Sequence, residues 1–382
     1  MKRILTNLTL LAAALIIGIF ICEITVRVFI PQQLIKVQDD VWAPDSVLGW
    51  RIKENMDVWV NTGDETVRII TDDNGHRIGS EDLAERSRKA EKSLLVLGDS
   101  FVQGFEVDNS ATIPSCLARK LTQKSGVATA CVNAGVRGYN PGQYYKAAKK
   151  ELKRKEYDMG VVCLWIGDDC YPDIDTTFSP HNIVTRHYFT FPEALNWNAI
   201  ITSMLYPFND MMETRSHLFV LLKTRFENIL SKFGLTAKDF PDLFFKSERN
   251  SSRWKDTAKT CGFIQEAFSR EGAPVLFVIL PTEFQVYQDI FYNYVDWFEI
   301  PIDSVDIDMP NQLLMEALES EGLPCVDILS RLREKASNGA KLYCEVDIHL
   351  NAAGCEAVAE CILSEAARIL QQENIFDEGK NS

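Results

Sequence analysis

Short apolar segments alternate with segments of helical spacing through most of the chain. The apolar segments are residues 93–97, 129–132, 159–166, 274–280 and 323–328. Segments whose apolar residues recur every three or four positions lie between and after them, at residues 113–121, 144–152, 253–271, 310–321 and 351–371. Strands that are apolar at every position are buried on both faces, which is typical of a parallel sheet covered by helices. The pattern predicts an α/β fold with three layers, α/β/α, around a central parallel sheet.

Two regions interrupt this alternation. Residues 31–92 are polar and punctuated by Pro and Gly, with one strand-like stretch at residues 67–71. Residues from 170 to about 250 are rich in aromatic side chains and irregular, apart from a helical stretch near residues 218–226. We therefore expect an N-terminal segment (1–30), an intermediate segment (31–92) and one α/β domain (93–375) with a long insertion at about 170–250.

The N-terminal segment is predicted to be a membrane anchor. After Lys2 and Arg3, residues 4–22 carry no charge, a length close to the ~20 residues that cross a bilayer. The two basic residues place the N-terminus in the cytoplasm, so the bulk of the chain is expected outside it. A cleaved signal peptide and a buried core helix are the alternatives, although no small-x-small cleavage site follows the apolar run.

Composition and charge indicate which kinds of binding partner the protein is not expected to have. The chain has 382 residues, of which 46% are apolar and 25% charged, as in globular proteins. A formal net charge of −14 argues against nucleic-acid binding, which needs clustered Lys and Arg. The ten cysteines include no Cys-x-x-Cys or Cys/His spacing of a zinc site. We expect no nucleic-acid partner, no metal and no organic cofactor.

A serine and a histidine stand where the predicted fold can bring them together. The strand at residues 93–97 runs into Gly98-Asp99-Ser100, and Asp347-Ile348-His349 precedes the last helix. A serine hydroxyl is a weak nucleophile until a base takes its proton and a third group orients that base. The sequence predicts a serine hydrolase with Ser100 as nucleophile, His349 as general base and Asp347 as the group that orients the imidazole.

Several motifs together resemble the SGNH/GDSL hydrolase superfamily, and within it the bacterial membrane-anchored members. Gly98-Asp99-Ser100 matches the serine motif, residues 132–139 match the glycine motif, and residues 347–351 with Gly354 match the terminal Asp-x-His-x-Asn motif. Residues 48–51 and 74–77 resemble the segment before the serine motif of these proteins, with His76 in place of a more usual Phe. The order and spacing of the motifs, rather than any single one, make the resemblance specific.

The resemblance implies a flavodoxin-like hydrolase fold and an oxyanion hole. The backbone N–H groups of Ser100 and Gly135 are the expected donors, and glycine at 135 permits unusual backbone angles and close approach. The family's third donor is an Asn side chain after the third strand, where this chain has Asp168. An ionised carboxylate only accepts hydrogen bonds and repels an oxyanion.

Three outcomes for Asp168 are open. In the first, Asp169 and desolvation keep Asp168 protonated, as apolar sites do for some carboxylic acids. Alternatively, the site works with two backbone donors at a lower rate, or esterase activity is lost.

The resemblance also implies where the protein acts and on what. It points to a single-pass protein of the bacterial cell membrane, with an extracytoplasmic serine esterase domain that hydrolyses O-acyl, chiefly O-acetyl, esters. The expected partners are an acylated carbohydrate, in particular a polysaccharide, or another small ester, and the membrane through the N-terminal helix. Acyl transfer to a cell-surface glycan is an alternative that uses the same triad. A catalytically impaired envelope binding or assembly protein on the same fold is the other.

Overall fold

The computed structural model describes residues 2–32, 34, 41–62, 64–79, 89–169, 208, 211–212, 215–232, 241–345 and 348–372. The chain forms two compact units. One unit contains Met1–Val37 and Thr185–Asp239, and the other contains Gln38–Val184 and Phe240–Ser382. Most of the predicted insertion at about 170–250 lies outside the described residues. The predicted triad member Asp347 lies outside them as well.

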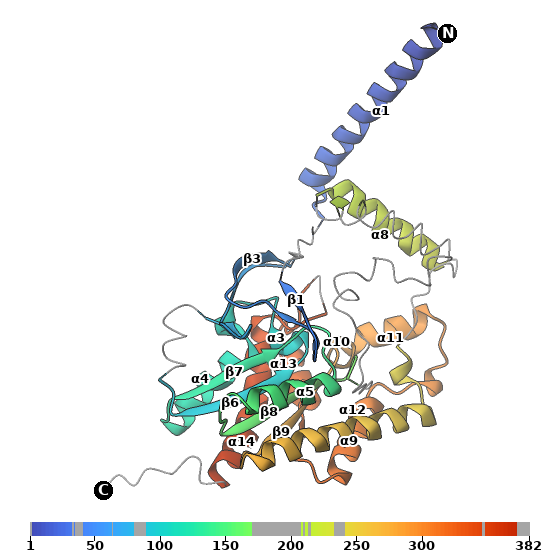
Figure 1. Ribbon diagram of the computed structural model, residues 1–382. Coiled ribbons are helices and arrows are strands. Elements are labelled where there is room, and N and C mark those ends of the chain that lie inside the picture. The colour runs from blue at the N-terminus through green and yellow to red at the C-terminus, as the bar shows by residue number, and fades with distance from the viewer. Residues whose placement is uncertain are drawn as a thin grey trace. The chain divides into compact units, whose positions relative to one another are not determined.

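An eight-stranded sheet forms the centre of the larger unit, in the order β10-β9-β8-β6-β7-β5-β4-β3 (Figure 1). Its parallel strands are β6 (Lys92–Gly98), β7 (Thr129–Gly135), β8 (Met159–Trp165), β9 (Val275–Leu280) and β10 (Cys325–Asp327). In chain order these five strands have the 2-1-3-4-5 arrangement of flavodoxin-like folds. The predicted α/β class and its central parallel sheet are confirmed.

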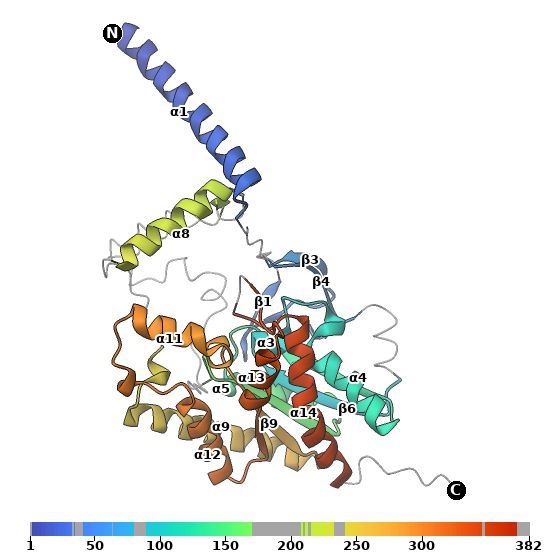
Figure 2. The ribbon, with the colours of Figure 1, turned by 180° about the vertical axis from the view of Figure 1, so that it is seen from behind.

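Helices cover both faces of this sheet, because alternate residues of each parallel strand enter different cores. On β6, Leu95 and Leu97 belong to one core, and Leu94 and Val96 belong to the other. The first core is covered by α5 (Pro141–Leu152), α9 (Glu248–Arg270) and α12 (Met309–Ser320). The second core is covered by α4 (Ile113–Ser125), α13 (Leu329–Ser337) and α14 (Ala352–Gln372), the helices seen in front of the sheet in Figure 2.

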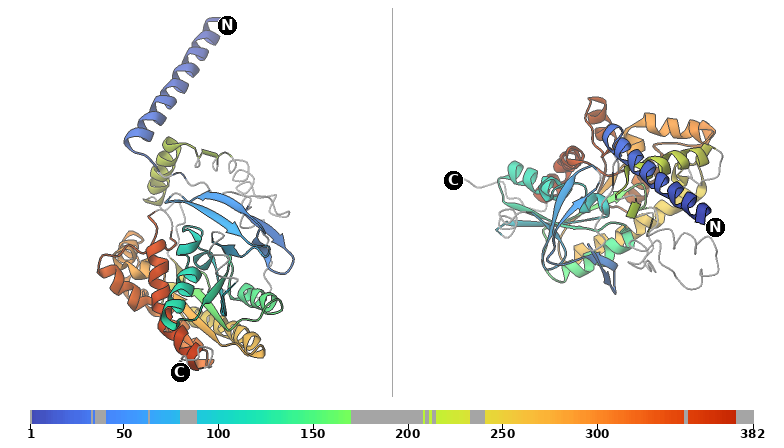
Figure 3. Two further views of the ribbon diagram at one scale, coloured as in Figure 1. Left: turned by 90° about the vertical axis from the view of Figure 1, so that its left-hand side faces the viewer. Right: turned by 90° about the horizontal axis from the view of Figure 1, so that it is seen from above.

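An antiparallel extension continues the sheet beyond β7, and Figure 3 shows it in blue. It consists of β3 (Asp57–Asn61), β4 (Thr66–Thr71) and β5 (Arg77–Ile78). The sequence predicted only the stretch that became β4, whose residues alternate between exposed and buried. The short β5 pairs with β7 through Arg77 and Asn133, so this extension joins the parallel part of the sheet at β7.

Shorter elements complete the larger unit. A separate two-stranded sheet pairs β1 (Trp42–Asp45) with β2 (Gly49–Ile52). The short helical elements are α3 (Ser100–Gln103), η1 (Asn109–Ala111), η3 (Asp242–Phe244), α10 (Glu283–Val286), α11 (Gln288–Trp297) and η4 (Ile302–Ser304).

The smaller unit contains α1 (Lys2–Phe29) and α8 (His217–Lys232). Among the described residues, α1 is the one helix long and apolar enough to cross a membrane, over Arg3–Phe29. The Glu23 carboxylate accepts hydrogen bonds from Ser216 Oγ at 2.7 Å and from Leu218 N at 2.9 Å. The end of α1 therefore caps the start of α8, since the first N–H groups of a helix lack intrahelical acceptors.

Candidate active site

Ser100 is presented by a tight turn at the carboxyl end of β6. Asp99 is the N-cap of α3, and its side chain accepts a hydrogen bond from Phe101 N at 2.9 Å. Gly104 ends α3 in the left-handed region, at φ 62°, and its N–H donates to Ser100 O. Ser100 is thus the first residue of a short helix, held at both ends by local caps, and it is buried.

Two glycines let α3 pack tightly against the ends of β6 and β7. A Cβ atom on Gly98 would lie 2.4 Å from Val102 Cγ2, and one on Gly135 would lie 2.3 Å from Gln103 N. Gly98 and Gly135 are register partners on the two strands. Gly135 thus allows close packing of α3, and its φ is not in the positive region, so the expected unusual backbone angle is absent.

His349 lies against Ser100, as the sequence predicted. The distance between His349 Nε2 and Ser100 Oγ is 2.7 Å, and both side chains are buried. The Phe101 ring packs on the imidazole with centroids 4.9 Å apart. Asn351 holds the loop that carries the histidine, because its Nδ2 donates to Lys341 O and Tyr343 O, each at 3.0 Å.

The other ring nitrogen of His349 faces a carboxylate that the sequence interpretation missed. Glu106 Oε1 lies 3.4 Å from His349 Nδ1, and the Glu106 side chain is 1% exposed. Asp347, the predicted orienting group, lies outside the described residues. The one sequence signal for Glu106 is its position between the apolar residues Phe105 and Val107, which places a charge inside a buried segment.

The predicted oxyanion donors have distinct environments. Ser100 N is in the first turn of α3, where N–H groups have no intrahelical acceptor. The Gly135 N–H donates to Asn133 Oδ1 at 3.1 Å, so it is engaged within its own strand. An oxyanion role for the Gly135 N–H stays a prediction, and it requires this hydrogen bond to be exchanged for one to the substrate.

Three aspartates lie around the end of β8 and the serine turn. Asp168 is exposed, whereas Asp99 and Asp169 are buried. Burial raises the pKa of Asp99, to which the nearby charge of Asp168 adds. Burial likewise raises the pKa of Asp169 well above its usual range, although Trp165 N donates to its carboxyl at 2.6 Å. Of the adjacent pair after β8, Asp169 is therefore the desolvated acid and Asp168 meets solvent.

The segment that precedes the serine motif supports the loop after β7. Trp50 Nε1 donates to Arg137 O at 3.0 Å, and Tyr139 Oη donates to Trp50 O. Gln143 Nε2 donates to Leu48 O at 2.7 Å. Trp50 of β2 and Leu48, just before β2, thus hold the backbone that follows Gly135 in place.

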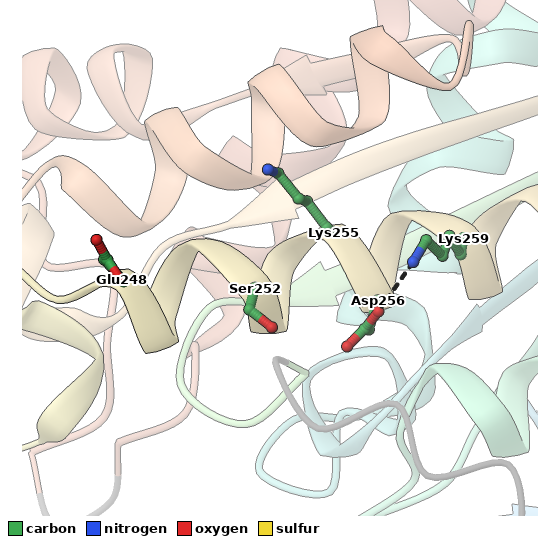
Figure 4. A pocket seen from close by; sticks show the side chains of 5 residues that line it. All are labelled: Glu248, Ser252, Lys255, Asp256 and Lys259. Atoms are coloured by element: carbon green, nitrogen blue, oxygen red, sulfur yellow. Dashed lines mark hydrogen bonds and ion pairs between the residues drawn. The ribbon is translucent and has the colours of Figure 1, made fainter.

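A surface hollow elsewhere in the unit is not part of this constellation. Figure 4 shows it along one face of α9, where Asp256 and Lys259 form an ion pair at 3.2 Å. Its lining residues are Glu248, Ser252, Lys255, Asp256 and Lys259. All five belong to a single helix, and none is a predicted site residue.

No family model matches the chain, and no curated protein matches its sequence. Several solved structures are similar to it at low sequence identity. A lipolytic protein of the G-D-S-L family from Veillonella parvula is 13% identical, with a TM-score of 0.35, and the match covers 72% of this chain and 97% of that one. A two-domain esterase (CEX) active on acetylated mannans is 13% identical, with a TM-score of 0.38, and the match covers 79% of this chain and 54% of that one.

A third similar structure is AlinE4, described as an SGNH-hydrolase family esterase. It is 12% identical, with a TM-score of 0.33, and the match covers 73% of this chain and 96% of that one. At these identities the similarity concerns the fold, and the chemistry of this chain has to be inferred from its own residues. The solved structures that the chain is similar to thus include proteins described as a lipolytic G-D-S-L family member and an SGNH-hydrolase family esterase.

Proposed function

We propose that this protein is a serine esterase that hydrolyses O-acyl esters. The observation that carries the proposal is the 2.7 Å contact between Ser100 Oγ and His349 Nε2, formed by buried residues far apart in the sequence. A hydroxyl in hydrogen-bond contact with an imidazole is the arrangement that nucleophilic acyl transfer requires.

The reaction follows from this pair. His349 Nε2 accepts the Ser100 proton as Oγ attacks the acyl carbon, and the imidazolium then protonates the departing alcohol oxygen. Water, deprotonated by the same ring, attacks the acyl carbon of the acyl-enzyme. The bond to Ser100 Oγ then breaks, the imidazolium returns its proton to Oγ, and the acid is released. Asp347 remains the proposed orienting group, and the N–H groups of Ser100 and Gly135 remain the proposed oxyanion donors.

We further propose that the substrate is an O-acetylated polysaccharide outside the cytoplasm, with α1 as an uncleaved anchor. The choice of substrate class follows from the motif resemblance in the sequence. The anchor is supported by the length and apolar character of α1 and by the hydrogen bonds from α8 to Glu23, which tie the end of α1 to a second helix.

The test is labelling of the full-length protein in detergent with a fluorophosphonate, together with hydrolysis of p-nitrophenyl acetate. We expect wild type to be labelled at Ser100 and to release nitrophenol, and Ser100→Ala to lose both signals. Ser110→Ala, which changes an exposed serine ten residues away, is the matched control and should retain both.

Other outcomes of these experiments would favour a different function for the protein. Equal inertness of wild type and Ser100→Ala contradicts the esterase and favours a binding or assembly protein. With an acetylated donor and a glycan acceptor, an excess of acetylated glycan over free acetate identifies an acyltransferase instead.

A further inference from the structure

We infer that Glu106 is a positioning residue for His349, a second carboxylate that stabilises the charged imidazole during acyl transfer. This inference rests on the proposed function, since it assigns a role within the same site. It adds to the role proposed for Asp347 and concerns a different segment of the chain, the loop between α3 and η1.

The contact itself is close and shielded from water. Glu106 Oε1 is 3.4 Å from His349 Nδ1, and the two side chains are 1% and 5% exposed. Attraction between opposite charges at this distance is much stronger in a buried site than in water. The imidazole gains its positive charge when Ser100 loses its proton, so a carboxylate here stabilises the step in which the nucleophile forms.

Arg77 holds the loop that carries Glu106. Its Nη1 donates to Gln103 O at 3.1 Å and also to Gly104 O, and its Nη2 donates to Val107 O at 2.5 Å. These carbonyls flank Glu106 on both sides in the sequence. The loop is thus clamped around the carboxylate, which limits the rotation of its side chain away from His349.

Arg77 also makes a buried negative charge at Glu106 tolerable. A carboxylate this deeply buried is destabilising unless positive charge is nearby. Burial lowers the pKa of Arg77 to about 10, while the charge of Glu106 acts to raise it, so the guanidinium stays protonated at neutral pH. Interactions therefore run from Arg77 of β5 to Glu106, from Glu106 to His349, and from His349 to Ser100.

Other titratable groups act on this pair from the surrounding elements. The charge of Asp108 acts on Arg77, and Asp99 and His349 interact electrostatically across the serine turn. From α14, the buried thiol of Cys355 lies within the field of Glu106 and Arg77, and burial raises its pKa, which keeps it neutral. Asp108 is exposed, unlike Glu106, and it supplies a matched control for the charge of this loop.

The experiment follows the His349 ring by NMR in full-length protein with ¹³C-labelled histidine, in detergent. The chain has five histidines, so loss of one signal in His349→Gln assigns the ring. In Glu106→Gln, which keeps the shape and removes the charge, we expect the titration midpoint of this ring to fall by about one pH unit or more. Asp108→Asn should leave the midpoint unchanged.

Kinetics supply the second readout. In Glu106→Gln we expect kcat to fall about tenfold or more with little change in KM, and the acidic limb of kcat/KM to move to lower pH with the ring. Should Glu106→Gln fail to fold, Glu106→Asp keeps the charge one methylene further back, and an intermediate shift is expected.

The two proposals fail in different ways. If wild type has no esterase activity but the ring still titrates lower in Glu106→Gln, the reaction is wrong and the electrostatic role of Glu106 stands. An unchanged ring midpoint in Glu106→Gln, or an equal shift in Asp108→Asn, overturns the role of Glu106 even in an active esterase.

Discussion

At the scale of single residues, the proposed nucleophile and base are in contact, and three carboxyl groups lie around them. Ser100 and His349 are in contact, while Asp99 and Asp169 are buried close by and Asp168 lies at the exposed end of β8. Burial raises the pKa of Asp99 and of Asp169 and so disfavours their charged forms, which leaves the exposed Asp168 as the carboxyl group expected to bring negative charge near a developing oxyanion. Such a charge opposes formation of the oxyanion. The proposed nucleophile and base are in contact, and we expect the proposed oxyanion side of the site to be the part that limits the rate.

Replacement of Asp168 by Asn tests this charge. Asp168→Asn removes a carboxylate and supplies an amide donor, so we expect kcat/KM for p-nitrophenyl acetate to rise about tenfold. A fully enclosed oxyanion donor typically changes kcat by about 10²–10³-fold, and we expect a smaller effect because residue 168 is exposed. Asp303→Asn, which changes an exposed aspartate of η4, is the control for loss of charge. A fall in activity would show that the Asp168 carboxylate takes part in the reaction.

At the scale of elements, a histidine links the antiparallel extension to helix α5. His76, next to β5, has Nδ1 at 3.4 Å from Asp72 Oδ2 and Nε2 at 3.3 Å from Glu151 Oε1. Burial acts to lower the pKa of His76, but hydrogen bonds and charges from Asp72 and Glu151 outweigh it and raise the pKa to about 9. The neighbouring residue is Arg77, so this link also supports the loop that carries Glu106.

This link makes the stability of the extension dependent on pH. The histidine is charged in the folded protein up to about pH 9 but loses its proton near 6.5 when unfolded, so its contribution is complete below pH 6.5 and disappears as the pH rises through 9. We expect His76→Gln to lower the free energy of unfolding by up to about 3 kcal/mol at pH 6, and by little at pH 10.

Urea denaturation from pH 6 to pH 10 measures this difference between wild type and His76→Gln. His217→Gln, which changes a histidine of the smaller unit, should follow the pH dependence of wild type. Equal pH dependence of wild type and His76→Gln would show that His76 is not charged in the folded protein.

At the scale of the whole molecule, α1 and α8 belong to the smaller of the two compact units, and Ser100 and His349 belong to the larger one. Glu23, in the last two turns of α1, accepts hydrogen bonds from Ser216 Oγ, His217 N and Leu218 N. Arg27 Nη2 donates to Arg215 O at 2.9 Å. A segment removed as a signal peptide would leave these groups of α8 without their partners, which favours retention of α1.

We expect the mature protein to keep its N-terminus and to remain in membranes. Mass spectrometry of the purified full-length protein should detect peptides from residues 1–30, and alkaline carbonate should leave the protein in the membrane pellet. A reporter enzyme that folds only outside the cytoplasm should be active when fused after residue 382. A mature N-terminus beyond residue 22 would identify a cleaved signal peptide and contradict the anchor.

Much of the core could be predicted because its signals are local. The apolar runs that became β6, β7, β8 and β9 are buried on both faces, and such strands show their character residue by residue. The extension was mostly missed, because β3 and β5 are short and acquire their partners only from other strands. Glu106 was missed for a similar reason, since its partner His349 is distant in the sequence.

The sequence by itself determined the α/β class, the parallel core and the pairing of Ser100 with His349. These follow from hydrophobic pattern and from the rule that carboxyl ends of parallel strands meet at one edge. Only the tertiary structure decided that Glu106 faces His349, that Arg77 clamps its loop, and that Asp169 rather than Asp168 is buried. Burial and electrostatic partners depend on which segments pack together, and that information is not contained in any local stretch of sequence.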